Sequence, residues 1–213
     1  MCTPTDDDSK ELKQKQESLQ MKYSQRINKA IRVATYLHRN QTRRGTDIPY
    51  IAHPFAVFLI LCEYTDDEDV LIAGLLHDVL EDADPREYDA DKLRNDFGGQ
   101  ILQIVQNVSE QKNGDISKGD AKSSWKDRKE AYLDHLRSVG EESLWVSTAD
   151  KIHNLSSTIE DLKMDGGVVW TKFNAPKAEQ LWFYGEFCSI VKSRTKNPIV
   201  QKLDSLFQEV ENL

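Results

Sequence analysis

Apolar residues recur three and four positions apart along most of the chain, which is the spacing of an amphipathic α-helix. In the segment that begins at Tyr23, the residues Ile27, Ala30 and Leu37 share one such apolar face. The same spacing predicts further helices, over residues 52–64, 70–82, 90–97, 101–108, 126–138, 142–162, 174–193 and 198–211. Residues 166–173 have a strand-like composition but no partner strand, so the sequence predicts a single all-α domain.

The polar segments outside these helices are of three kinds. Residues 1–22 are polar and contain no aromatic residue, which predicts an N-terminal tail or a loosely docked helix ahead of a domain over residues 23–213. Residues 39–49 form a basic connection rich in turn-forming residues. Residues 109–125 contain two glycines and many charges, which is typical of a long surface loop, and loops of this length are usually functional or disordered.

Composition and charge narrow the classes of partner and location. The 213 residues include 36 acidic and 28 basic side chains, a net charge of −8, which disfavours general nucleic-acid binding. The longest apolar run, Phe55–Cys62, is far shorter than the ~20 residues of a membrane-spanning helix. The polar N-terminus lacks the apolar core of a signal peptide, and three widely spaced cysteines argue against disulfides. We therefore expect a cytoplasmic protein with neither nucleic acid nor membrane as a partner.

The sequence LLHDVLED places His77, Asp78, Glu81 and Asp82 in an otherwise apolar helix. Residues three and four positions apart share a helix face, so the carboxylates are expected to cluster. Burying such groups costs free energy unless they are compensated, and a divalent cation would compensate them because adjacent His and Asp supply a nitrogen and an oxygen donor. The alternative is the solvated polar end of a core helix, which this segment alone does not exclude.

Two residues elsewhere in the chain favour the metal site. His53 begins the second predicted helix, and Asp150 lies within the apolar helix predicted over residues 142–162. Alone, each is more often structural, His53 as a capping or core histidine and Asp150 as a hydrogen-bonded acid. Their occurrence together with the doublet His77-Asp78, in the order His, His-Asp, Asp, is much harder to obtain by chance.

This order of residues resembles the metal site of the HD-domain phosphohydrolases, and its context resembles the RelA/SpoT-type alarmone hydrolases, in particular their small single-domain form. The resemblance runs from residue 30 to residue 190, through HRNQTRRGTDIPYIAHP (38–54), AGLLHDVLEDAD (73–84), FGGQILQIVQNVS (97–109), SWKDRKEAYL (124–133) and TADKIHNL (148–155). It implies a compact HD-domain bundle of about eight to ten helices. Only the hydrolase part of the long family members is matched.

The resemblance also implies a role for each matching residue. His53, His77, Asp78 and Asp150 would hold one ion, usually manganese, although other divalent ions fit the same donors. Glu81 and Asp82 would position and activate the attacking water. The residues implied to bind substrate are Arg43, Arg44, Lys126, Lys151, Asn154 and an aromatic side chain, Tyr184 or Trp182.

The other titratable residues receive structural interpretations. His38 continues the apolar face of the first helix, and His153 is expected to support Asp150 from behind. In the loop over residues 109–125, three lysines are expected to be solvated, Lys112, Lys118 and Lys122. The cysteines have no catalytic partner pattern and are expected to be inert.

These features together predict a manganese-dependent enzyme. It would hydrolyse the 3′-pyrophosphate of (p)ppGpp-like alarmones, or their adenine counterparts, with a water held at the ion, to give GDP or GTP and pyrophosphate. The alternatives are an HD-family 5′-nucleotidase or other nucleotide phosphohydrolase, and a non-catalytic nucleotide-sensing module. In each case the partner is a small nucleotide, and an oligomer is compatible with the sequence.

The acidic charge is concentrated in one part of the chain. Residues 63–96 contain 13 acidic and three basic side chains, whereas residues 39–44 contain three arginines and no acid. The acidic segment includes candidate metal ligands, and the basic turn suits phosphate groups. The net charge therefore does not exclude an anionic substrate.

Overall fold

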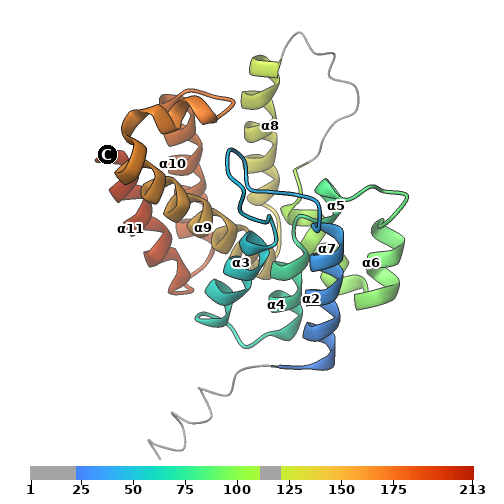
Figure 1. The fold of residues 1–213 in the computed structure, drawn as a ribbon. Coiled ribbons are helices and arrows are strands. Elements are labelled where there is room, and N and C mark those ends of the chain that lie inside the picture. The colour runs from blue at the N-terminus through green and yellow to red at the C-terminus, as the bar shows by residue number, and fades with distance from the viewer. Residues whose placement is uncertain (1–22, 111–120) are drawn as a thin grey trace, which may run out of the picture.

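The regular elements in the computed structural model, which describes residues 23–110 and 121–213, are all helices (Figure 1). They are α2 (Gln25–Leu37), α3 (Ala52–Cys62), α4 (Glu68–Leu76), α5 (Val79–Asp82), α6 (Ala90–Phe97), α7 (Gly99–Val108), α8 (Ala121–Leu136), α9 (Glu141–Asp165), the 3-10 helix η1 (Gly166–Lys172), α10 (Lys177–Arg194) and α11 (Ile199–Glu211). The predicted all-α fold is confirmed.

Helix α9 runs through the middle of the bundle and packs against α3, α4, α7 and α11 (Figure 1). Its apolar residues are buried on several faces, including Leu144, Ile152 and Leu155. Helix α4 is enclosed on all sides, because every residue from Val70 to Leu76 is buried, and a helix that is apolar all round belongs in a core. Helices α4 and α9 are thus neighbours in the core, and candidate ligands lie on α9 and directly after α4.

The polar end of the α4 segment differs from the prediction. A single helix over residues 70–82 is wrong, since α4 ends at Leu76, the chain turns at His77 and Asp78, and the short α5 follows. The imidazole of His77 donates to the carbonyl of Gly74 at 2.8 Å, so a side chain satisfies one of the last carbonyls of α4. This turn aims both His77 and Asp78 at the same space.

Other predicted segments are corrected or lie outside the described residues. Residues 166–173 do not form a strand-like excursion, because Gly166–Lys172 continue α9 as the 3-10 helix η1. Helix α8 begins at Ala121, several residues before its predicted start. The predicted tail over residues 1–22 lies outside the described residues, as do residues 111–120 of the predicted loop. Among the described helices, none has the length and apolar character needed to cross a bilayer.

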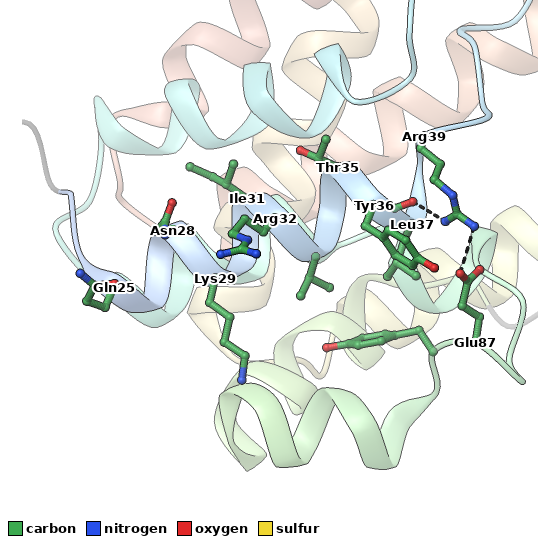
Figure 2. A pocket seen from close by; sticks show the side chains of 12 residues that line it. Gln25, Asn28, Lys29, Ile31, Arg32, Thr35, Tyr36, Leu37, Arg39 and Glu87 are labelled. Carbon is green, nitrogen blue, oxygen red and sulfur yellow. Dashed lines mark hydrogen bonds and ion pairs between the residues drawn. The ribbon is translucent and has the colours of Figure 1, made fainter.

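A cavity of about 1000 Å³ runs along the outer side of α2, between that helix and the chain around Tyr88 (Figure 2). At one end Arg39 pairs with Glu87 at 3.1 Å. None of the candidate metal ligands lines this cavity. They line a smaller one instead, of about 210 Å³, at the centre of the bundle.

Candidate metal centre and active site

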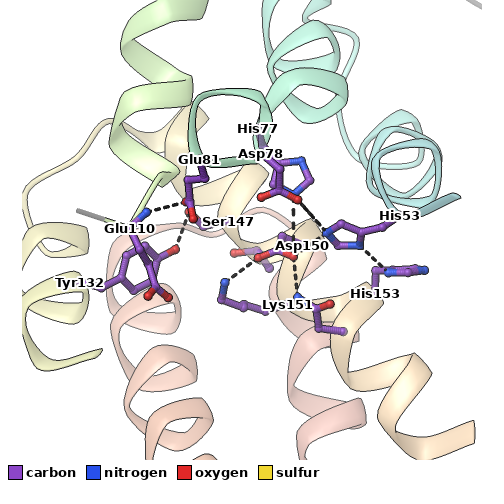
Figure 3. A network of polar contacts seen from close by, with 12 residues as sticks. His53, His77, Asp78, Glu81, Glu110, Tyr132, Ser147, Asp150, Lys151 and His153 are labelled. Atoms are coloured by element: carbon purple, nitrogen blue, oxygen red, sulfur yellow. Dashed lines mark hydrogen bonds and ion pairs between the residues drawn. The ribbon is translucent and has the colours of Figure 1, made fainter. Parts of the chain in front are cut away.

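Three separate helical segments bring the candidate ligands together (Figure 3). His53 is in the first turn of α3, His77 and Asp78 form the turn after α4, and Asp150 is midway along α9. His53, His77 and Asp150 each offer one donor atom, and these three atoms lie within 4.8 Å of one another. Nε2 of His53 is 3.1 Å from Nε2 of His77 and 3.1 Å from Oδ1 of Asp150.

Asp78 supplies the fourth donor. Its Oδ2 lies 3.0 Å from Nε2 of His77 and 3.5 Å from Nε2 of His53. Both histidines are buried, with 1% and 4% of their surface exposed, while the two carboxylates are partly open to the cavity. The structure therefore brings together the four residues that the sequence singled out.

Each histidine is held by its other ring nitrogen. Nδ1 of His77 donates to Gly74, whose carbonyl only accepts, so Nε2 is the ring nitrogen of His77 that faces the cluster. Nδ1 of His53 lies 2.7 Å from Nδ1 of His153. The expectation that His153 supports Asp150 is thus corrected, because its hydrogen-bond partner is His53.

The charged groups of the cluster change one another's pKa values. Burial lowers the pKa of His53. Burial also acts to lower the pKa of His77, but the charge of Asp78 and its hydrogen bond outweigh this and raise that pKa to about 9. Burial opposes ionisation of Asp78, yet His77 and then His53 hold the pKa of that carboxyl below its usual range.

The donor set fits a divalent metal ion. Imidazole nitrogens suit Zn²⁺ and carboxylate oxygens suit the harder Mn²⁺, so this mixed set fits either ion, and a cation at its centre would compensate the two largely enclosed carboxylates. Carboxylates must be deprotonated to bind a metal ion. The pKa of Asp150 is held well below its usual range, against burial, by Lys151 and by His53. Since the pKa of Asp78 is lowered too, both carboxylates are deprotonated.

The acidic pair on α5 divides between the cavity and the surface. Glu81 lines the cavity, and its Oε1 accepts a hydrogen bond from the backbone N–H of Glu110 at 2.7 Å. Asp82 is exposed, and its backbone carbonyl accepts from the side chain of Gln41 at 3.1 Å. Only Glu81 of this pair is among the residues that line the described cavity.

Positive and amide groups line the same cavity. The guanidinium of Arg43 donates to Oδ1 of Asn154 at 3.2 Å, and the amide of Asn154 donates to Oδ1 of Asp150 at 2.6 Å. Nζ of Lys151 lies 2.5 Å from Oδ2 of Asp150. Arg43 is presented by a turn in which Thr42 bridges to Pro49 and Gly45 adopts a φ of +76°, a conformation that favours glycine.

The cavity lined by the candidate metal donors, the first cavity of the site, adjoins a second cavity of about 180 Å³. The two share three lining residues, Lys129, Lys151 and Asn154. Arg44 and Tyr184 line this second cavity, together with aromatic side chains from three segments, Trp125, Phe173 and Phe183. Burial raises the pKa of Tyr184 to about 12, so its hydroxyl stays protonated. The first cavity is thus polar and is lined by the candidate metal donors, whereas the second is lined by basic and aromatic side chains.

Lys126 and Trp182 line neither cavity. The Lys126 side chain is 54% exposed, its Nζ is 5.3 Å from the centre of the Trp182 ring, and it lies 4.0 Å from Glu130. Lys129, three residues further along α8, points into both cavities instead.

The sequence patterns indicate no role in the site for Tyr50 or Glu110, and they favour Lys126 over Lys129 as the lysine at the substrate. The hydroxyl of Tyr50 donates to Oδ2 of Asp78 at 2.6 Å, and a signal for it existed, since Tyr50 is one helical turn before His53. Lys129 forms a partly buried ion pair with Glu110, which no local pattern indicates because the two residues meet only in the folded chain.

Comparison with known proteins places these residues in a family. Residues 30–177 match the HD domain family. The chain is 32% identical to the guanosine-3′,5′-bis(diphosphate) 3′-pyrophosphohydrolase MESH1 of Danio rerio, over 84% of this chain and 91% of that protein.

Longer relatives match over part of their length. The bifunctional (p)ppGpp synthase/hydrolase SpoT of Escherichia coli is 33% identical over 66% of this chain, and a GTP pyrophosphokinase of Streptomyces coelicolor is 37% identical over 61%. The chain spans 19% and 14% of the lengths of these two proteins.

Solved structures support the same fold. One, described as a metazoan ortholog of SpoT that hydrolyses ppGpp, superposes with a TM-score of 0.69 at 24% identity, over 91% of this chain and 99% of that one. Another, lmo0812 from Listeria monocytogenes, gives a TM-score of 0.64 at 26% identity, over 76% of this chain and 99% of that one. With the family match over residues 30–177, these similarities show that the chain belongs to the HD-domain family.

Proposed function

We propose that this protein is a metal-dependent hydrolase that removes the 3′-pyrophosphate from (p)ppGpp-like alarmones, giving GDP or GTP and pyrophosphate. The observation that carries the proposal is the convergence of His53, His77, Asp78 and Asp150 at one cavity that basic side chains also line. Relatives named as 3′-pyrophosphohydrolases of guanosine-3′,5′-bis(diphosphate) support this choice of substrate.

A bound divalent ion, for which Mn²⁺ is our proposal, neutralises charge on the phosphoryl oxygens and lowers the pKa of water. The carboxylate of Glu81 accepts the proton of the attacking water, and Asp82, the second member of the acidic pair, helps to position that water. Arg43 and Lys151 bind the pyrophosphate oxygens, since both line the same cavity as the metal donors.

The second cavity is proposed to hold the nucleoside. Arg44 and Tyr184 offer flat faces for a purine, and Asn154 lies between the two cavities with an amide suited to the ribose. Guanine and adenine share the π-face that such stacking recognises, so both purines belong in the test. Cys62 and Cys188 are free thiols, which fits the cytoplasmic location that we propose.

A panel of nucleotides, incubated with and without Mn²⁺ and separated by chromatography, tests the proposal. We expect guanosine or adenosine 3′-pyrophosphates to be converted to the 3′-hydroxyl nucleotide, with pyrophosphate as the second product and only when metal is added. Orthophosphate from 5′-monophosphates would indicate a 5′-nucleotidase instead. Bound metal with no turnover of any nucleotide would indicate a nucleotide-sensing module.

A further inference from the structure

The two cavities of the site meet at the side chains that line both of them, Lys129, Lys151 and Asn154. If the pyrophosphate occupies the cavity with the metal donors and the nucleoside occupies the aromatic one, the ester bond between them passes these three groups. The 3′-oxygen that leaves during hydrolysis therefore departs next to two lysine ammonium groups. An alkoxide is a poor leaving group at neutral pH, so a proton donor at this place would accelerate the reaction.

The two lysines differ in how their ammonium groups are engaged. Lys151 lies 2.5 Å from Oδ2 of Asp150, one of the candidate metal ligands, which commits it to that carboxylate and to phosphate binding. Lys129 comes from a different helix, α8, and pairs with Glu110 at the end of α7. Its side chain is 17% exposed and its Nζ lies 4.7 Å from the centre of the Phe183 ring.

We propose that Lys129 is the catalytic acid that protonates the departing 3′-oxygen, an inference that rests on the proposed pyrophosphohydrolase function. The oxygen of the attacking water forms a bond to the phosphorus attached to the 3′-oxygen, and the bond between that phosphorus and the 3′-oxygen breaks. The electron pair of the broken bond stays on the 3′-oxygen, which takes a proton from Nζ of Lys129. Glu81 takes the proton of the water, and exchange with solvent returns both residues to their starting states.

The environment of Lys129 supports this role. Burial lowers the pKa of Lys129, and it remains lowered although the carboxylate of Glu110 acts to raise it. From α9, Lys151 lowers this pKa further, while Asp150 acts in the opposite direction. The other groups packed against the ammonium are the rings of Trp125 and Phe183. An ammonium with a lowered pKa gives up its proton more readily than an exposed lysine does.

Glu110 also connects Lys129 to Glu81, the residue proposed to accept the proton of the water. The carboxylate of Glu110 pairs with Lys129, while the backbone N–H of Glu110 donates to Glu81 at 2.7 Å. Glu110 thus contacts both the proposed acid and the proposed base at the wall of the first cavity.

Two substitutions separate proton donation from positive charge. Lys129→Met removes both, whereas Lys129→Arg keeps the charge but cannot release a proton near neutral pH. We expect both variants to lower kcat on the natural 3′-oxygen ester by about 10²- to 10⁴-fold, the usual contribution of a general acid. Lys163→Met is the matched control, because Lys163 is exposed, pairs with Glu209 and lines neither cavity.

A substrate with sulfur in place of the bridging 3′-oxygen gives the decisive comparison. A thiolate leaves without protonation because thiols have a pKa of about 8.5, so both Lys129 variants should recover to within about 10-fold of the unaltered enzyme on this substrate. Equal losses on the oxygen and sulfur substrates, or no loss on either, would overturn the inference. Mn²⁺ binding and thermal unfolding of each variant verify that the site and fold are intact. Failure of the unaltered enzyme to release pyrophosphate would instead refute the proposed function itself.

Discussion

Each candidate ligand is held from behind by a hydrogen bond to a second group. The pairs are His53 with His153, His77 with the carbonyl of Gly74, Asp78 with Tyr50, and Asp150 with Asn154. Such contacts fix the orientation of a ligand and the position of its proton, and their loss weakens metal sites even when every ligand is present. The affinity for metal should therefore depend on residues that do not bind the ion.

Tyr50→Phe tests this dependence. It removes the hydroxyl that donates to Oδ2 of Asp78 at 2.6 Å but keeps the ring, so we expect Mn²⁺ affinity to fall by about 10- to 100-fold with little change in unfolding temperature. Titration calorimetry on the metal-free protein measures this. Tyr36→Phe is the control, because Tyr36 is 55% exposed on α2, and unchanged affinity in Tyr50→Phe would contradict the role of the hydroxyl.

His153 should make the metal-free protein less stable in acid. Burial, followed by His53 and Arg43, lowers the pKa of His153 to about 4, whereas an unfolded chain has a histidine pKa of about 6.5. Between these values the unfolded state binds more protons, so the contribution is full above pH ~6.5 and is lost as the pH falls toward 4.

The measurement is urea unfolding of the metal-free protein and of His153→Gln. The stability of the unaltered protein relative to the variant should be constant above pH ~6.5 and should decrease between pH ~6.5 and about 4. A difference that does not vary with pH would show that the protonation of His153 is the same in the folded and unfolded states.

The cluster of candidate metal donors could be predicted from the sequence, but the orientation of other residues that line the cavity could not. His53, His77, Asp78 and Asp150 form a pattern of residue types in a fixed order, which does not require knowledge of packing. Whether Lys126 or Lys129 faces the cavity depends on how α8 is rotated about its axis, and the charges along α8 do not determine that rotation.

Among the elements, the turn between α4 and α5 has the most direct effect on the site. Helix α4 is packed tightly against α3, and at Gly74 a Cβ atom would lie 2.4 Å from Cδ1 of Leu61, a fully buried side chain. The same residue supplies the carbonyl that orients His77. Gly74 therefore connects the packing of two core helices with the position of a metal donor.

Gly74→Ala should destabilise the protein despite alanine's higher helix propensity. Overpacking a core costs about 1–3 kcal/mol, and the gain in propensity offsets up to ~1 kcal/mol of this. We expect lower stability in urea together with weaker Mn²⁺ binding. Gly99→Ala, at the start of α7 where nothing lies within 4 Å of the added carbon, should be neutral or slightly stabilising. A Gly74→Ala protein as stable as the unaltered one would contradict the close packing of α3 and α4.

The helices were largely predictable, whereas their interruptions were not. The spacing of apolar residues indicates α2, α6, α7 and α11 because each has one buried face. The break at His77 and Asp78 depends on a side chain competing for a backbone carbonyl, and η1 continues α9 past Gly166 in a segment without helical spacing. Neither event leaves a pattern in the hydrophobic residues.

At the scale of the whole molecule, the site is assembled from distant parts of the chain around one central helix. His53 and His153, 100 positions apart, meet through α3 and α9, and Arg43 and Asn154, 111 positions apart, meet at the wall of the cavity. The acidic segment over residues 63–96 and the basic turn over residues 39–44 thereby both supply residues that line the cavity. A chain with a net charge of −8 can in this way offer a basic wall to an anionic substrate.

The most direct test of the account is the release of pyrophosphate from ppGpp in the presence of Mn²⁺, compared between the unaltered protein and Asp78→Ala. The account predicts one pyrophosphate for each GDP formed by the unaltered protein. Asp78→Ala should release none and bind no metal, while its circular dichroism spectrum shows the same helical content. Turnover by Asp78→Ala at the normal rate with added Mn²⁺ would contradict the assignment of the metal site.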